Sequence, residues 1–176
     1  MPTDLDASVL FVCLGNICRS PLAEGVLAHR LEAAGVSKRI RVESAGTGAW
    51  HVGQVPDPRS IAVAAEHGIE LKGHARQVRL EDFVEFTLIL AMDRSNLKDL
   101  QDLEAGTGSN TSVRLFSDFD PDPDADPDVP DPYYGGEEGF ERVFKMVDRT
   151  CHALVEHILG GRPTFKHSTP TTSAKP

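Results

Sequence analysis

The sequence predicts an α/β fold of three layers, in which a four-stranded parallel sheet carries helices on both faces. Four short apolar runs alternate with segments that repeat apolar residues at helical spacing, and this alternation is typical of parallel sheets built through right-handed crossovers. The chain of 176 residues has the length of one domain. Its hydrophobic content of 40% and charged content of 26% lie in the ordinary globular range.

The first strand and helix are predicted around a short loop. Residues 8–12 form a continuous apolar run, which fits a strand that is buried on both faces. Pro21 suits the first turn of a helix, because its missing N–H has no helical partner there. Apolar residues recur at helical spacing as far as Ala34, and Gly35 suits the end of the helix.

The remaining elements continue the alternation. Three further strands are predicted at residues 40–44, 87–92 and 113–116. Helices are predicted at residues 58–67 and 80–85, through Leu97, Leu100 and Leu103, and along a long apolar stripe at residues 140–158. Either Asp93 or Ser95 could cap the third of these helices. Cys151 lies in the final stripe and is expected in the core.

The expected domain spans residues 1–161 and includes one segment that breaks the pattern. Residues 117–130 are acidic and rich in proline, and we expect an irregular loop there, inserted into the domain. Residues 162–176 are polar and rich in Ser, Thr and Pro, which is typical of a mobile tail.

Composition argues against several classes of protein. The net charge of −9 does not suit a broad nucleic-acid surface, which needs clustered Lys and Arg. No apolar run approaches the roughly 18 residues that span a membrane, and the N-terminal residues carry acids where a secretory signal has bases. Three cysteines are too few for a secreted disulfide framework. We therefore expect a cytoplasmic protein with reduced thiols and no nucleic-acid or membrane partner.

The loop after the first strand, CLGNICRS at residues 13–20, carries the clearest chemistry. Functional sites in parallel α/β sheets lie at the carboxyl ends of the strands. Cys13 sits at such an end and faces a helix N-terminus, whose N–H groups stabilise a thiolate. Arg19 can bind two oxygens of a tetrahedral oxyanion over the same point. The pattern Cys, five residues, Arg, Ser is typical of cysteine-dependent phosphatases, so the sequence predicts a phosphate-binding loop with a nucleophile.

The sequence also resembles the low-molecular-weight protein tyrosine phosphatases over most of residues 8–160. The resemblance lies in VLFVCLGNICRSPLAEGVL, VESAGTGAW, HARQV, EDFVEFTLILAMDRSNLKDL and DPYYGGEEGFERV. It implies hydrolysis of phosphotyrosine and other aryl phosphates through a phosphocysteine intermediate, with no cofactor and no metal. Phosphotyrosine-containing proteins would be the partners, and weak self-association is a further candidate property.

The same resemblance assigns the site residues. Cys13 would be the nucleophile, Arg19 would hold the phosphoryl group, and Asp131 would be the general acid and then the base. The substrate-binding residues that it implies are Leu14, Gly15, Asn16, Ile17, Cys18, Ser20, Trp50, Tyr133 and Tyr134. Ser44 and Asp93 would fix the loop. Relatives that act on phosphoarginine tend to carry threonine at the position of Ile17, so isoleucine favours an aryl phosphate.

Two features depart from the family pattern. Gly73 stands where the family usually carries a loop-supporting histidine, with His74 next, so the network behind the loop is expected to be rearranged. The acidic segment before Asp131 is also distinctive, and it leaves the position of the acid loop open. Neither His51 nor His74 has the spacing of a metal site, and both are expected to have surface or structural roles.

Several alternatives stay open at this point. The residues alone do not single out Asp131 among its neighbouring aspartates; only the DPYYG match does. Cys18 is either a loop filler or a partner that forms a reversible disulfide with Cys13. An arsenate reductase of the same fold would need further cysteines near the third strand, and residues 60–95 contain none. A phosphate-binding module without turnover would require that Asp131 does not reach the site.

The spacing of aspartates in the acidic segment also suggests a calcium site. Aspartates fall on the six ligand positions of an EF-hand loop, at Asp120, Asp122, Asp124, Asp126, Asp128 and Asp131. Ala125 stands where the sharp turn needs glycine, and the prolines stiffen the segment. A solvated acidic loop is therefore the preferred interpretation.

Overall fold

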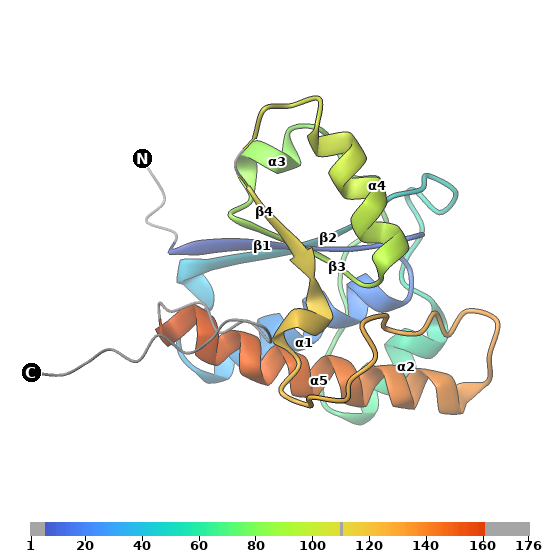
Figure 1. Ribbon diagram of the computed structural model, residues 1–176. Helices are drawn as coiled ribbons and strands as arrows, with labels where there is room; N and C mark the ends of the chain where they lie inside the picture. The colour runs from blue at the N-terminus through green and yellow to red at the C-terminus, as the bar shows by residue number, and fades with distance from the viewer. Residues whose placement is uncertain (1–5, 110, 161–176) are drawn as a thin grey trace, which may run out of the picture.

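A single four-stranded parallel sheet organises the protein, in the strand order β2-β1-β3-β4 (Figure 1). The computed structural model describes residues 6–109 and 111–160. The strands are β1 (Ala7–Cys13), β2 (Ile40–Gly46), β3 (Leu88–Ala91) and β4 (Ser112–Leu115). All three neighbouring pairs are parallel, which confirms the predicted fold class. The predicted tail at residues 162–176 lies outside the described residues, so the domain boundary at residue 161 stays a prediction.

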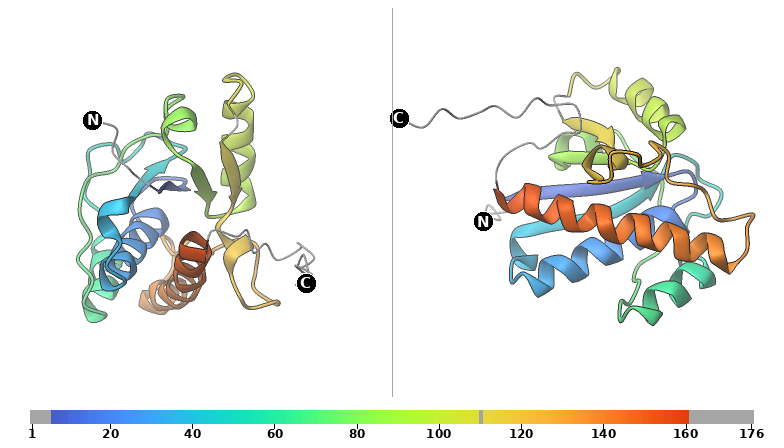
Figure 2. Two further views of the ribbon diagram at one scale, coloured as in Figure 1. Left: turned by 90° about the vertical axis from the view of Figure 1, so that its left-hand side faces the viewer. Right: turned by 60° about the horizontal axis from the view of Figure 1, so that its bottom comes forward.

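Helices cover both faces of the sheet (Figures 1 and 2). One face carries α1 (Arg19–Ala33), α2 (Pro58–Glu66) and α5 (Glu137–Gly160), and the other carries α3 (Asp82–Glu85) and α4 (Arg94–Glu104). Successive side chains of a strand point to opposite faces. Val9 and Phe11 accordingly join the core beneath α1 and α5, while Leu10 and Val12 join the core beneath α3 and α4. This explains why residues 9–12 of β1 are all apolar.

The helices α1, α2 and α4 differ in how their N-termini are capped. Asp57 caps α2 by accepting the N–H of Arg59 at 2.8 Å, and Asp93 caps α4 by accepting the N–H of Asn96 at 2.7 Å. The cap of α4 is therefore Asp93 and not Ser95. Helix α1 begins at Arg19, and its N-cap residue Cys18 makes no side-chain capping bond. The N-terminus of α1 thus faces the loop that follows β1.

The acidic segment is more ordered than the sequence suggests. Phe116–Phe119 forms a 3-10 helix, so the prediction of an irregular loop is wrong for residues 117–119. Residues three apart lie on the same side of such a helix, and both Phe116 and Phe119 are buried. Asp120 follows with only 3% of its surface exposed, and both of its oxygens accept hydrogen bonds from Arg149 of α5, at 2.8 and 2.7 Å. The start of the segment is therefore packed against the core and is not simply solvated.

Two other boundaries differ from the prediction for local reasons. Strand β2 extends to Gly46, and β4 ends at Leu115 because Phe116 enters the 3-10 turn. A further 3-10 turn, Ser37–Arg39, joins α1 to β2. Within residues 6–109 and 111–160, no helix has the length and apolar character that crossing a membrane requires.

Candidate active site

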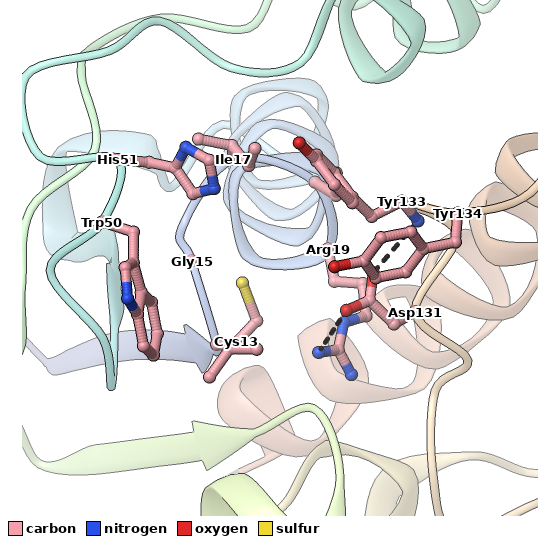
Figure 3. Close-up of a pocket in the computed structure, with 11 residues that line it drawn as sticks. Cys13, Gly15, Ile17, Arg19, Trp50, His51, Asp131, Tyr133 and Tyr134 are labelled. Atoms are coloured by element: carbon pink, nitrogen blue, oxygen red, sulfur yellow. Dashed lines mark hydrogen bonds and ion pairs between the residues drawn. The ribbon is translucent and has the colours of Figure 1, made fainter.

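Cys13 is the last residue of β1 and stands at the start of the loop that leads to α1 (Figure 3). Cys13 is 2% exposed, and its Sγ accepts the backbone N–H of Asn16 at 3.3 Å. Asn16 adopts a φ of 57°, a left-handed conformation that asparagine tolerates better than most residues. This turn brings the N–H back toward the sulfur. Ser20 Oγ lies 3.0 Å from the same sulfur.

Several backbone N–H groups of this loop have no protein acceptor among the described residues. In the described part of the chain, the backbone N–H groups of Leu14, Gly15, Ile17 and Cys18 donate to no protein acceptor. They lie next to the N-terminus of α1, where the helix dipole favours negative charge. Concave arrays of backbone N–H groups at a helix start bind phosphate. The loop therefore has the donors that a tetrahedral oxyanion needs.

The side-chain amide of Asn16 supports the loop from behind. Its Nδ2 donates to Ser20 Oγ at 2.8 Å and to Ser44 Oγ at 2.9 Å, and its Oδ1 accepts the N–H of Arg76 at 2.9 Å. Ser44 in turn donates to Glu24 Oε1 at 2.7 Å. Burial raises the pKa of Glu24 above its ordinary value, although the hydrogen bond from Ser44 opposes this shift. Every hydrogen-bonding atom of the Asn16 amide group thus has a partner.

The segment that supports Asn16 is itself fixed by a buried carboxylate. Asp82 is fully buried and accepts two hydrogen bonds from the guanidinium of Arg76, at 2.9 and 3.1 Å. It also accepts the backbone N–H of Arg79 at 2.8 Å. The backbone of this segment pairs with Gly46, whose N–H donates to Arg76 O at 2.8 Å. A Cβ on Gly46 would lie 2.9 Å from Leu14 O, so this close approach requires glycine.

Arg19 is placed beside the nucleophile by two acceptors. The residue is 2% exposed, and its Nη1 donates to Asp93 Oδ2 at 2.7 Å and to Val129 O at 3.0 Å. Burial opposes its charge, but Cys13, Asp93 and Asp131 outweigh burial and raise the pKa of Arg19. The guanidinium therefore stays charged and is held in one orientation before any anion binds. Asp93 thus serves both as the cap of α4 and as the partner of Arg19.

These groups face a cleft of about 340 Å³ (Figure 3). Its lining residues are Cys13, Leu14, Gly15, Ile17, Cys18, Arg19, Trp50, His51, Asp131, Tyr133 and Tyr134. Trp50 and Tyr134 stand on opposite sides of Cys13 and are 72% and 93% exposed. The Tyr133 and Tyr134 rings meet edge to face at a centroid distance of 4.9 Å. The cleft therefore has aromatic walls above a polar floor.

Two of the predicted substrate-binding residues occupy a different place. Asn16 and Ser20 are 3% and 0% exposed and do not line the cleft. Their side chains are engaged with one another and with the sulfur of Cys13, so they act behind the loop. His51, in contrast, lines the cleft, whereas the sequence predicted only a surface or structural role for it. Its position directly after Trp50 in a loop at the carboxyl edge of the sheet was the available signal.

Asp131 is the aspartate that the fold brings to the cleft. Its Oδ2 lies 3.6 Å from Arg19 Nη2, its Oδ1 accepts the N–H of Tyr133 at 3.1 Å, and its side chain is 39% exposed. Asp128 instead pairs with Arg94, at 3.0 Å. The structure therefore separates Asp131 from its neighbours, which residue spacing alone did not do.

The aspartates of the acidic segment do not assemble the calcium ligand set that their spacing suggested. Asp120 binds Arg149 and Asp128 binds Arg94, so these two carboxylates are directed toward different cations. Among the described residues, no group of three or more His, Cys, Asp and Glu side chains could hold a metal ion.

Cys18 lies in the same cleft as Cys13 but differs in its surroundings. The residue is 5% exposed, and burial together with the charge of Asp57 raises the pKa of its thiol to about 12. It is therefore a neutral thiol near pH 7. All three cysteines are free and buried. The disulfide between Cys13 and Cys18 stays a prediction, and it would require that Cys18 lose its proton as it attacks an oxidised Cys13.

Comparisons with known proteins agree with this geometry. A family model described as low molecular weight phosphotyrosine protein phosphatase matches residues 8–161. The low molecular weight protein-tyrosine-phosphatase of Streptomyces coelicolor is 45% identical over 151 residues, which cover 85% of this chain and 92% of the relative. The low molecular weight phosphotyrosine protein phosphatase of Schizosaccharomyces pombe is 48% identical over 142 residues, covering 80% and 90%. A crystal structure of a protein tyrosine phosphatase from Entamoeba histolytica is 36% identical, with a TM-score of 0.81 and coverage of 88% of this chain and 98% of that chain.

Proposed function

The chain belongs to the low-molecular-weight phosphotyrosine protein phosphatase family, and from this membership we propose that Cys13, Arg19 and Asp131 are its catalytic residues. The protein is a protein tyrosine phosphatase that hydrolyses phosphotyrosine through a phosphocysteine intermediate. One observation carries the residue assignment. The sulfur of Cys13 accepts the N–H of Asn16 in the loop before α1, and Arg19 and Asp131 line the same cleft as Cys13.

In the first step, the thiolate of Cys13 attacks the phosphorus of the substrate. The loop N–H groups and the guanidinium of Arg19 bind the equatorial oxygens, whose negative charge they stabilise in the transition state. The P–O bond to the tyrosine breaks as the S–P bond forms. Protonated Asp131 donates its proton to the departing phenolate oxygen. Because Asp93 and Val129 already hold Arg19, little reorganisation is needed during this step.

In the second step, water hydrolyses the phosphocysteine. The carboxylate of Asp131 accepts a proton from the water as the water oxygen attacks the phosphorus. The S–P bond breaks, and its electron pair returns to the sulfur of Cys13. Ser20 Oγ, 3.0 Å from this sulfur, can donate a hydrogen bond to the leaving thiolate. Inorganic phosphate is then released.

The shape of the cleft supports an aryl phosphate as substrate. Trp50 and Tyr134 offer flat apolar walls on either side of Cys13, and flat walls of this kind pack well against a phenyl ring. Ile17, which also lines the cleft, adds an apolar contact and no hydroxyl. A phosphate-binding module without turnover would require that Asp131 lie out of reach of the bound phosphate. Asp131 instead lines the cleft. An arsenate reductase would need further cysteines near the third strand, and residues 60–95 of this chain contain none.

We also infer the setting in which the enzyme acts. Phosphotyrosine-containing proteins are its proposed partners, and a thiolate nucleophile requires a reducing compartment such as the cytoplasm. Three free cysteines support this inference. Weak self-association stays a prediction.

Hydrolysis of p-nitrophenyl phosphate in the presence of a metal chelator tests the mechanism. We expect full activity without metal, and a loss of about a thousandfold or more in Cys13→Ser and in Arg19→Ala. Cys151→Ala removes another buried thiol, far from the cleft, and serves as the control that should stay active. Activity that requires added metal, or undiminished activity in Cys13→Ser, would contradict the assignment.

A further inference from the structure

A second groove opens beside the catalytic cleft, and no step of the reaction uses it. We call it the side groove, and its volume is about 430 Å³. Its lining residues are Ile17, His51, Gln54, Val55, Pro56, Asp57, Pro58 and Tyr133. Ile17, His51 and Tyr133 also line the catalytic cleft, so the two hollows are continuous. In Figure 3, Ile17 and His51 lie together on one side of the cleft, and Tyr133 lies beside Tyr134 on the side of Asp131.

One wall of the side groove, residues 54–58, is hydrogen-bonded to the loop that follows Cys13. The backbone N–H of Asp57 donates to Ile17 O at 2.8 Å. Two bonds join the same segment to Ala75, from Gly53 N to Ala75 O at 2.9 Å and from Ala75 N to Gln54 O at 2.8 Å. The position of this wall is therefore set by the same loop that positions the nucleophile.

Arg59 joins the two walls of the side groove. Its Nη2 donates to Asp57 Oδ2 and to Tyr133 O, both at 3.0 Å, and its Nη1 donates to Gly135 O at 3.0 Å. The hydrogen bonds from Arg59 hold the pKa of Asp57 below its ordinary range. The groove is therefore formed before a substrate binds, which reduces the ordering cost of occupying it.

The groove offers an apolar surface to its occupant. Val55 is 58% exposed at its wall, beside Pro56 and Pro58. The negative charge of Asp57 is balanced within the groove wall, because both of its carboxylate oxygens accept hydrogen bonds from the guanidinium of Arg59. Apolar surface removed from water at such a wall is stabilising in proportion to its area. The chemistry of the groove thus favours an aliphatic side chain.

We propose that the side groove is a subsite for an apolar side chain of the substrate protein, two positions away from the phosphotyrosine. This inference rests on the proposed function. When the phosphate lies at Cys13, the substrate backbone must lie at the mouth of the cleft. Side chains two apart in an extended chain point the same way, and are separated by about 7 Å. A substrate chain that passes over His51 and Tyr133 therefore places the side chain two residues from the phosphotyrosine in the side groove.

The test compares phosphotyrosyl peptides that differ at one position. Each pair carries leucine or serine two residues before, or two residues after, the phosphotyrosine. We expect the wild-type enzyme to hydrolyse one of the two leucine peptides with a kcat/KM about fivefold higher than its serine counterpart, since one apolar contact of this size discriminates by roughly that factor or more. In Val55→Ser, this leucine-to-serine ratio should fall to about one.

The chain offers a matched control in Val52→Ser. Val52 is 56% exposed and lies in the same loop as Val55, but it lines neither the groove nor the cleft. Its substitution should leave the leucine-to-serine ratio at the wild-type value. Equal hydrolysis of all peptides by the wild-type enzyme, or an equal loss of the ratio in both variants, would overturn the subsite while leaving the phosphatase intact. Absence of hydrolysis of both p-nitrophenyl phosphate and the peptides would instead overturn the proposed function.

Discussion

The active site joins two loops that are held in place in different ways. The phosphate loop, residues 13–18, is closely packed, and Cys13 and Asn16 in it are 2% and 3% exposed. Its supports are hydrogen bonds among side chains of α1, β2 and the segment that ends at buried Asp82. The nucleophile is therefore positioned by the core of the protein.

The acid loop, residues 120–135, is anchored at a few points, which include the buried Val129, between exposed residues. Asp120 binds Arg149, Asp128 binds Arg94, and Val129 N donates to Met92 O at 2.8 Å. Asp131 itself is 39% exposed at its side chain. Changes to the phosphate loop should thus affect folding and all substrates, whereas changes to the acid loop should affect proton transfer and respond to pH and salt.

The largest effect is expected from Asp131→Asn, which tests whether the acid loop acts only through proton transfer. We expect kcat/KM, which reports the formation of the phosphocysteine, to fall by about a hundredfold or more for phenyl phosphate, whose phenolate is a poor leaving group. The loss of kcat/KM should be much smaller for p-nitrophenyl phosphate, because its leaving phenolate needs less protonation. A plot of log kcat/KM against the pKa of the leaving phenol measures this difference. Asp128→Asn is the control, and a steeper plot for it than for Asp131→Asn would mean that Asp128 is the acid.

Asp82→Ala tests whether the phosphate loop depends on the core behind it. Removal of this buried carboxylate leaves the guanidinium of Arg76 without its partner, and breaking such a pair costs about 3 kcal/mol of stability. Urea unfolding measures the change. The remaining folded enzyme should also lose activity toward good and poor leaving groups alike. Asp99→Ala, on the exposed side of α4, provides the reference, and equal stability of the two variants would contradict the dependence.

Low pH should weaken the attachment of the acid loop at Asp120. Burial opposes the charge of this carboxylate, but hydrogen bonds from Arg149 and from the N–H of Asp122 outweigh burial and hold its pKa below the ordinary value. A group whose pKa is lowered on folding contributes stability above its unfolded pKa of about 3.9, and loses it as the pH falls through the folded value. Urea midpoints should therefore drop below about pH 4, and less steeply in Asp120→Asn. Asp124→Asn, which alters an exposed carboxylate, should show the wild-type slope; an identical slope in Asp120→Asn would refute this role.

The smallest effect is expected from Arg94→Ala. Arg94 and Asp128 are 67% and 34% exposed, and ion pairs of this kind contribute little and are screened by salt. We expect kcat for phenyl phosphate to fall about twofold to fivefold at low salt, and the difference from wild type to shrink in 1 M NaCl. Lys98→Ala removes a comparable exposed pair from the same helix, and should have no effect. A loss that persists at high salt would show that Arg94 acts in another way.

The two loops also differ in how far the sequence predicted them. The phosphate loop is local: Cys13, Arg19 and the start of α1 lie within a few residues, so spacing and secondary structure were sufficient to predict their arrangement. The strands were predicted for a similar reason, because burial on both faces leaves a continuous apolar run. Asp131 was identified by resemblance, since its distance to Arg19 depends on the path of the chain between them.

Long-range supports were the part that the sequence did not indicate. Glu24 and Ser44 are 20 residues apart, and Asp120 and Arg149 are 29 apart. No periodicity relates such pairs, because they form only when separate elements pack together. HARQV and EDF belonged to the family resemblance, but the structure was needed to show that Arg76 and Asp82 meet within them.

The N–H groups of the phosphate loop also link the enzyme's folding to the chemistry of its surroundings. An anion that binds the folded loop, and has no such site on the unfolded chain, stabilises the protein by mass action, by about 2.7 kcal/mol at a hundredfold excess over its Kd. Inorganic phosphate, the product of the reaction, is such an anion. Inorganic phosphate competes with the substrate and should also raise the melting temperature of the enzyme. The phosphate concentration should therefore affect both the rate of hydrolysis and the stability of the folded protein.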